Sequence, residues 1–170
     1  MKKLFILFCL AVVSVAPILP QAEGDVFTIY LVRHSERDDE GARVRDPGLS
    51  EVGVLRSKRL ATIFSETEIE RIYSTDYRRT IMTATPVAES KGIEPELYDG
   101  TDLSAIHDLL LSRWEDALVV GHSNTTSVLA GMLAGQELHP MCESIYDRLY
   151  IVVISGRSAR LILLNQGFAG

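Results

Sequence analysis

The sequence predicts an α/β protein, a three-layer α/β/α sandwich with a mostly parallel sheet. Short apolar segments alternate with longer segments of helical periodicity over most of the chain. The short segments lack polar alternation, as strands do when helices cover both faces of their sheet. Two apolar runs close to each other near the C-terminus indicate a final hairpin. The 170 residues, 46% of them apolar, suit one compact domain.

The predicted strands are short and rich in β-branched, aromatic or aliphatic residues. The buried parallel strands are residues 28–32 (TIYLV), 71–74 (RIYS) and 117–121 (ALVVG), with a short extended piece at residues 96–98. The segments LYIVVIS and RLILL, residues 149–155 and 160–164, are separated by four residues, which predicts an antiparallel hairpin at the end of the sheet.

Two helices are predicted in the first half of the chain. Ser50 can cap a helix over residues 51–64, which Gly53 weakens near its start. A second helix runs from Arg79 to Lys91 and ends at Gly92. Pro86 in its interior predicts a kink or an early break.

Two more helices are predicted in the second half. The first begins at Asp102 or Ser104 and continues through residues 105–114. The second covers residues 126–135, with Ser123 or Asn124 as its cap. Each helix follows a predicted strand, so helices on both faces of the sheet are expected.

The N-terminus has the layout of a secretory signal. Two lysines precede an apolar stretch over residues 4–16, shorter than the roughly 20 residues that a membrane span needs. An uncleaved anchor is the weaker alternative. We expect cleavage after Ala22, so that residues 1–22 are a signal peptide and residues 23–170 form a periplasmic or secreted domain. Contact with a membrane is then expected only through the signal.

Charge and cysteine content narrow the partners. A net charge of −6 argues against nucleic acid, which normally requires a basic stripe. An anionic ligand must therefore be held by a local cluster. After loss of the signal, Cys142 is the one remaining cysteine, so neither a disulfide nor a cysteine-rich metal site is expected. We predict no cofactor, and the sequence indicates no oligomeric state.

Charged side chains follow the three predicted parallel strands. Arg33 and His34 end the first, Arg79 follows the second, and His122 and Ser123 follow the third. The carboxyl ends of parallel strands meet at one edge of the sheet, where ligands bind. Imidazole can act as a nucleophile, and guanidinium groups pair bidentately with phosphate oxygens. The set predicts phosphoryl chemistry without a metal.

Four stretches stand out around these residues: LVRHSE (residues 31–36), DPGLSEVGVLRSKRLA (46–61), YSTDYRRTIMTA (73–84) and VVGHSN (119–124). They resemble, in the required order, motifs of the histidine phosphatase, or phosphoglycerate mutase-like, superfamily. The resemblance implies the phosphoglycerate mutase-like fold and a metal-independent, acid-type phosphatase that forms a phosphohistidine.

The resemblance also implies roles for single residues. His34 would be the nucleophile, Arg33 and Arg79 the phosphate clamps, and His122 the second histidine. Thr80 stands where the motif has alanine. Ser35 and the pair Thr75-Asp76 also depart from the usual residues, but no charged role is lost.

The general acid has no clean match, because the family's L-x-E segment is missing here. Asp102 or Asp99 could serve, and Asp102 is favoured because it stands at a junction of loop and helix. Ser123 and Arg43 are further candidates for contact with the substrate.

The predicted reaction is hydrolysis of an extracytoplasmic phosphorylated small molecule, sugar or glycan. Two alternatives stay open: a phosphohistidine protein phosphatase, and a phosphate-binding relic without turnover. A mutase is less favoured, since it must protect its phosphohistidine from water.

Overall fold

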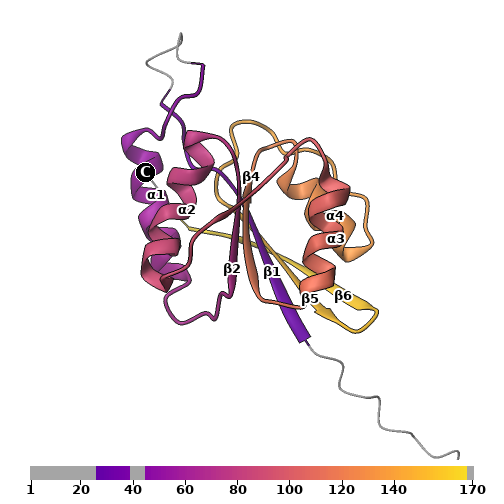
Figure 1. Ribbon diagram of the computed structural model, residues 1–170. Helices are drawn as coiled ribbons and strands as arrows, with labels where there is room; N and C mark the ends of the chain where they lie inside the picture. Colours follow the sequence, from indigo (N-terminus) through magenta and orange to yellow (C-terminus); the bar gives the residue numbers. More distant parts are fainter. Residues whose placement is uncertain (1–25, 39–44, 168–170) are drawn as a thin grey trace, which may run out of the picture.

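The computed structural model describes residues 26–38 and 45–167. The predicted signal peptide and Arg43 lie outside the described residues. Within the described residues one six-stranded sheet forms the middle layer, in the order β3-β2-β4-β1-β5-β6 (Figure 1). Its strands are β1 (Val26–Arg33), β2 (Arg71–Thr75), β3 (Glu96–Tyr98), β4 (Ala117–Gly121), β5 (Arg148–Ser155) and β6 (Ser158–Asn165).

The first four strands in that order are parallel, and β5 and β6 are antiparallel to their neighbours. The predicted mostly parallel sheet and the C-terminal hairpin are therefore confirmed. The turn between β5 and β6 is only two residues long, Gly156 and Arg157, because β6 begins at Ser158, two residues before the predicted apolar run.

Helices cover both faces of the sheet, as predicted. α1 (Glu51–Ile63) and α2 (Arg78–Lys91) lie together on one face, and α3 (Leu103–Arg113) and α4 (Thr126–Ala134) lie on the other (Figure 1). No helix in the described ranges is both long and apolar enough to cross a bilayer.

β1 explains why the central strands lack polar alternation. Phe27, Ile29 and Leu31 pack into the core beneath α3 and α4, whereas Val32 and Tyr30 pack into the core beneath α1 and α2. Successive side chains of a strand point to opposite faces. Both faces of β1 are buried, so both sets of side chains are apolar.

The start of α1 is the predicted one, but Gly53 has a different role. The Ser50 hydroxyl accepts a hydrogen bond from the Gly53 N–H at 3.2 Å, as an N-cap does. A Cβ atom at Gly53 would lie 2.1 Å from the carbonyl oxygen of Glu36. The glycine therefore lets α1 approach the loop after His34.

The predicted break at Pro86 was wrong, because α2 continues to Lys91 and ends at Gly92, which has a φ of 66°. Proline removes one N–H donor, whereas its neighbours Ala84, Val87 and Ala88 are buried. Packing against the sheet outweighs that local loss.

Of the N-caps predicted for α3 and α4, one is confirmed and the other is wrong. Asp102 caps α3 as predicted, accepting from the Ala105 N–H at 3.0 Å. The prediction for α4 was wrong: its N-cap is Thr125, and Ser123 and Asn124 lie in the turn before it. The hydroxyl of Thr125 accepts instead from the backbone N–H of His122, which closes that turn.

Candidate active site

A backbone hydrogen bond joins the carboxyl ends of β1 and β4 next to the predicted site residues. The His34 N–H donates to the Gly121 carbonyl at 2.9 Å. A Cβ atom at Gly121 would lie 2.8 Å from the hydroxyl oxygens of both Thr125 and Tyr98. The glycine therefore lets the hydroxyl groups of Thr125 and Tyr98 pack close to the end of β4.

A cavity of about 280 Å³ opens at this edge of the sheet. The five residues predicted at the ends of the three parallel strands line it: Arg33, His34, Arg79, His122 and Ser123. Three loops that are far apart in the chain thus meet at one site, as the position of the strand ends required.

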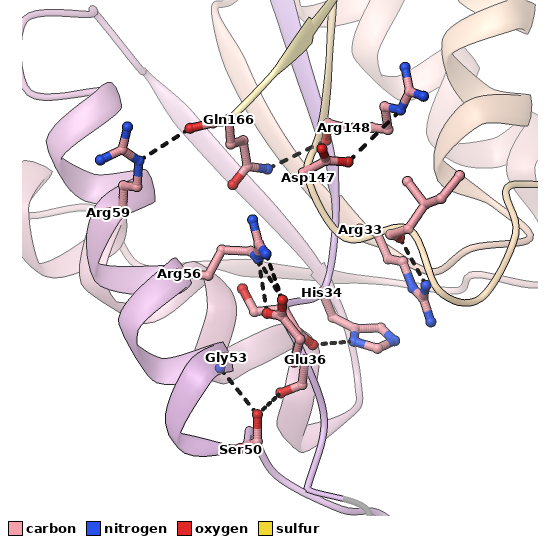
Figure 2. Close-up of polar contacts among 12 residues, drawn as sticks. Arg33, His34, Glu36, Ser50, Gly53, Arg56, Arg59, Asp147, Arg148 and Gln166 are labelled. Atoms are coloured by element: carbon pink, nitrogen blue, oxygen red, sulfur yellow. Dashed lines mark hydrogen bonds and ion pairs between the residues drawn. The ribbon is translucent and has the colours of Figure 1, made fainter. Parts of the chain in front are cut away.

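His34 has the protonation state that a nucleophile needs. Its Nδ1 lies 2.7 Å from the Ser35 carbonyl oxygen, which can only accept, so Nδ1 carries the proton and Nε2 keeps its lone pair (Figure 2). Burial, the main cause, and the positive charges of Arg33 and Arg79 together lower the pKa of His34 to about 3. The imidazole is therefore neutral at neutral pH.

Arg33 is held by the segment before β5. Its Nη1 donates to the carbonyl oxygens of Glu143 at 2.6 Å and Ile145 at 3.0 Å, and its guanidinium lies 4.0 Å from the centre of the Tyr146 ring. Arg33 is 5% exposed. Its buried Nε–H has no hydrogen-bond partner among the described residues. A fixed guanidinium with an unused donor suits an anion.

Arg79 is held more loosely. Its Nη1 lies 3.4 Å from the Asp46 carboxylate, its Nη2 lies 3.4 Å from His122 Nδ1, and its guanidinium lies 4.5 Å from the centre of the Tyr77 ring. Its buried Nε–H also lacks a partner in the described part of the chain. These long contacts leave Arg79 able to turn its donors to a ligand.

His122 faces His34 across the cavity, with 5.4 Å between the ring centres. Burial, the main cause, and the charges of Arg79 and Arg33 together lower the pKa of His122 to about 4. Its Nε2 lies 2.9 Å from the hydroxyl of Thr75. Both histidines are thus neutral bases beside two cations.

The loop after His34 is fixed from two sides. Arg56 of α1 binds the Glu36 carboxylate through Nε at 2.9 Å and Nη2 at 2.6 Å (Figure 2). The Ser35 N–H donates to the Thr83 hydroxyl of α2 at 2.9 Å. Ser35 is buried, and its carbonyl is the one that orients His34.

The structure does not bring Asp102 to the cavity, because its carboxylate caps α3. Asp99 does line the cavity. One Asp99 oxygen accepts from the N–H and the hydroxyl of Thr101, at 2.8 and 2.7 Å, and these bonds hold the pKa of Asp99 below its ordinary value. Asp99 is therefore ionised at neutral pH and has no proton to donate.

Several residues around the site were not predicted from the sequence, among them three aromatic or acidic side chains. Tyr77 and Glu143 line the cavity, and Tyr146 lies against Arg33. Tyr77 falls inside a recognised motif but at a variable position, and the other two stand in an irregular segment without periodicity. No pattern in the sequence pointed to them.

The described residues contain no group of three or more histidine, cysteine or carboxylate side chains arranged to hold a metal ion. The polar groups around the cavity are instead paired imidazoles and guanidiniums, a set that suits an anion.

Part of the chain matches a known protein family and a curated phosphatase. Residues 29–102 match the model of the histidine phosphatase superfamily, branch 1. Phosphoserine phosphatase 1 of Hydrogenobacter thermophilus is 37% identical over 70 residues, which are 39% of this chain and 33% of that protein. The chain therefore spans about a third of the length of this curated relative.

Solved structures agree over a larger share of the chain. The protein histidine phosphatase SixA, in a complex with tungstate, has a TM-score of 0.69 at 17% identity, over 82% of this chain and 97% of its own. A mycobacterial glucosyl-3-phosphoglycerate phosphatase has a TM-score of 0.61 at 15% identity, over 82% of this chain and 99% of its own. At these identities the similarity establishes the fold.

Proposed function

We propose that this chain, whose residues 29–102 match the model of the histidine phosphatase superfamily, hydrolyses phosphate monoesters through a phosphohistidine on His34. One observation carries the proposal. The free Nε2 of a neutral His34 shares a cavity with two arginines, each of which has a buried N–H without a partner among the described residues. A phosphoryl group would supply acceptors for both arginines.

In the first step His34 Nε2 attacks phosphorus, a P–N bond forms, and the bond from phosphorus to the leaving oxygen breaks. Arg33 and Arg79 pair with the phosphoryl oxygens, on which the negative charge is spread in the transition state. Ser35 keeps the Nδ1 proton in place, so that Nε2 is the atom that attacks.

In the second step water attacks the phosphohistidine in line, the P–N bond breaks, and inorganic phosphate leaves. Apart from the attacking water, every group assigned a part in this cycle is a side chain or backbone group of the chain itself. We therefore propose that turnover is independent of metal ions.

For the substrate we propose a small phosphorylated molecule or a phosphorylated glycan outside the cytoplasm. The apolar stretch over residues 4–16 behind two lysines supports export. The net charge of −6 supports a small anionic ligand held locally rather than a polyanion. The cavity, about 280 Å³, has room for a phosphoryl group and part of its leaving group.

The test is hydrolysis of p-nitrophenyl phosphate by the signal-free protein with excess chelator. His34→Ala should lose at least ~10³-fold in kcat, because the nucleophile is gone. His107→Ala is the matched control, since His107 lies on α3 away from the cavity and should keep wild-type turnover. Undiminished turnover in His34→Ala would refute the mechanism.

A phosphohistidine protein phosphatase is the second candidate, and the state of Asp99 favours it. An alkoxide leaving group needs a proton, whereas the imidazole of a phosphohistidine leaves more easily. Asp99 is ionised at neutral pH, and Asp102 is occupied as a helix cap. A rate for phosphohistidine far above that for alkyl phosphates would select this candidate.

A phosphate-binding relic is distinguished by the same assay together with calorimetry. Saturable binding of inorganic phosphate without hydrolysis of p-nitrophenyl phosphate or phosphohistidine would identify it. Formation of an acid-labile phosphoprotein that is absent from His34→Ala would exclude it.

A further inference from the structure

A chain of hydroxyl groups leads from His122 to the first turn of α2. His122 Nε2 lies 2.9 Å from Thr75 Oγ1, which lies 3.0 Å from Thr80 Oγ1. Thr80 Oγ1 lies 2.8 Å from the carbonyl oxygens of both Thr75 and Tyr77. Thr75 is 2% exposed and Thr80 is fully buried. Bulk water therefore does not compete for these bonds.

The carbonyl groups beside Thr80 decide which hydroxyl donates and which accepts in this row of hydrogen bonds. The Thr80 hydroxyl has one proton, and the two carbonyl oxygens beside it can only accept. Its proton is therefore committed to a carbonyl, and it offers Thr75 a lone pair. Thr75 must then donate its own proton to Thr80, which leaves a lone pair for His122 Nε2. A hydrogen bond at that point requires the proton to be on Nε2.

The other side of the ring agrees with this assignment. His122 Nδ1 lies 3.4 Å from Nη2 of Arg79, and a guanidinium can only donate. A proton on Nδ1 would place two donors against each other. The two contacts are independent and fix the same tautomer.

We infer that Thr75 and Thr80 are positioning residues that hold neutral His122 in its Nε2–H tautomer and leave Nδ1 as a hydrogen-bond acceptor on the cavity side. The tautomer follows from the hydrogen bonds alone. Its effect on catalysis rests on the proposed function.

The arrangement depends on Thr80, which distinguishes this protein from the family motif. Alanine is usual at that position of the family motif, and with alanine the Thr75 hydroxyl would have no committed acceptor. It could then donate to Nε2 and permit a proton on Nδ1. The threonine removes this choice.

An acceptor at Nδ1 has a consequence for phosphate. A fully ionised phosphoryl group would place an oxygen without a proton against the Nδ1 lone pair, so the complex must take up one proton between them. Free phosphate monoesters carry that proton below pH of about 6. kcat/KM should therefore fall ~10-fold per pH unit above that value.

The surroundings of His122 keep it neutral before the ligand binds. Arg79 faces it from α2 and Tyr77 from the position just before this helix. Arg33 and His34 face it from the end of β1, and Asp46 from the segment before α1. Burial and the two arginines lower its pKa, to about 4, and Asp46 acts in the opposite direction.

The first test reads the tautomer without reference to activity. Long-range ¹H–¹⁵N spectra of the labelled protein at pH 7 distinguish an Nε2–H from an Nδ1–H imidazole, and His122→Gln assigns the signal. The wild type and Thr80→Ser should show the Nε2–H form, and Thr80→Val should show a measurable share of the Nδ1–H form. Valine matches threonine in shape, and backbone N–H groups still satisfy the Thr75 and Tyr77 carbonyls. An Nδ1–H form in the wild type, or identical spectra for Thr80→Val and Thr80→Ser, would overturn the inference.

The second test compares pH profiles with p-nitrophenyl phosphate. Between pH 5 and 8 the wild type and Thr80→Ser should lose ~100-fold in kcat/KM. In Thr80→Val the ratio of kcat/KM at pH 8 to kcat/KM at pH 5 should be at least ~10-fold higher than in the wild type, because an Nδ1–H ring can bind the dianion. Parallel profiles for all three proteins would overturn the catalytic consequence. An inactive wild type with the Nε2–H form would refute the proposed function and leave the tautomer assignment standing.

Discussion

The carboxylate of Glu36 and the guanidinium of Arg56 form a bidentate ion pair that fastens the loop after His34 to α1. The Arg56 side chain is 8% exposed and the Glu36 side chain 22%. The pair stands two residues from the nucleophile and is not part of the cavity lining. It orders the backbone whose Ser35 carbonyl orients His34.

Glu36→Gln should destabilise the protein by about 2 kcal/mol, because a mostly buried guanidinium loses its charged partner. Burial raises the pKa of Glu36, but its bonds with Arg56 outweigh burial and keep the pKa below the ordinary value. The stabilisation is therefore present above the unfolded pKa, near 4.5, and is lost as the pH falls through the lower folded value.

Urea unfolding of wild type and Glu36→Gln at pH 7 and pH 3 measures this effect. Glu89→Gln on the exposed side of α2 is the control and should stay within about 0.5 kcal/mol of the wild type. A difference between wild type and Glu36→Gln that grows as the pH falls would contradict the assignment.

The pH dependence of turnover should show a lower limb well below that of an ordinary histidine. His34 attacks only when neutral, and burial holds its pKa near 3, so activity should persist at pH 5. With an ordinary pKa of 6.5, about 97% of His34 would be protonated at pH 5 and the rate would fall ~30-fold. The measurement is kcat/KM from pH 3 to pH 7.

Unfolding must be separated from this limb. A histidine whose folded pKa is lowered makes the protein less stable as the pH falls below about 6.5, since the unfolded chain binds the proton first. Circular dichroism at each pH identifies the range in which the protein is folded. A lower limb at pH 6 to 7 in folded protein would show that His34 titrates normally.

The leaving group should control the rate strongly. The ionised Asp99 cannot supply a proton at neutral pH, so p-nitrophenyl phosphate should be hydrolysed at least ~100-fold faster than an alkyl phosphate. Asp99→Asn and Asp102→Asn should change this ratio by less than about threefold. A ~10-fold selective loss with alkyl phosphates in Asp99→Asn alone would identify Asp99 as the acid after all.

The sheet and the order of its elements could be predicted because both faces of the central strands are buried. Strands such as β1 and β4 then appear in the sequence as unbroken apolar runs. The Ser50 N-cap of α1 and the end of α2 at Gly92 could also be predicted, because both depend on hydrogen bonds between residues close in the sequence. The positions of two arginines and two histidines after the parallel strands likewise predicted that they meet at one edge of the sheet.

The errors came from interactions between segments distant in the sequence. Packing against the sheet keeps α2 helical beyond Pro86. The close approach of the Glu36 carbonyl leaves no room for a side chain at Gly53. Asp102 stands correctly at the junction of loop and helix, but capping uses its carboxylate there. The segment that holds Arg33 has no periodic pattern, so its contacts follow only from the assembled fold.

That segment leads to a last prediction, which concerns Tyr146. The Arg33 guanidinium lies 4.0 Å from the centre of the Tyr146 ring, and such a contact at a largely desolvated site is worth about 1 to 2 kcal/mol. Tyr146→Leu keeps an apolar side chain but removes the π face, so Arg33 loses part of its positioning. The inhibition constant of inorganic phosphate should rise ~5- to 30-fold. Tyr146→Phe keeps the ring and should stay within about twofold of the wild type. Competitive inhibition of p-nitrophenyl phosphate hydrolysis measures all three proteins, and equal constants for the Leu and Phe variants would show that Arg33 is held by the Glu143 and Ile145 carbonyls alone.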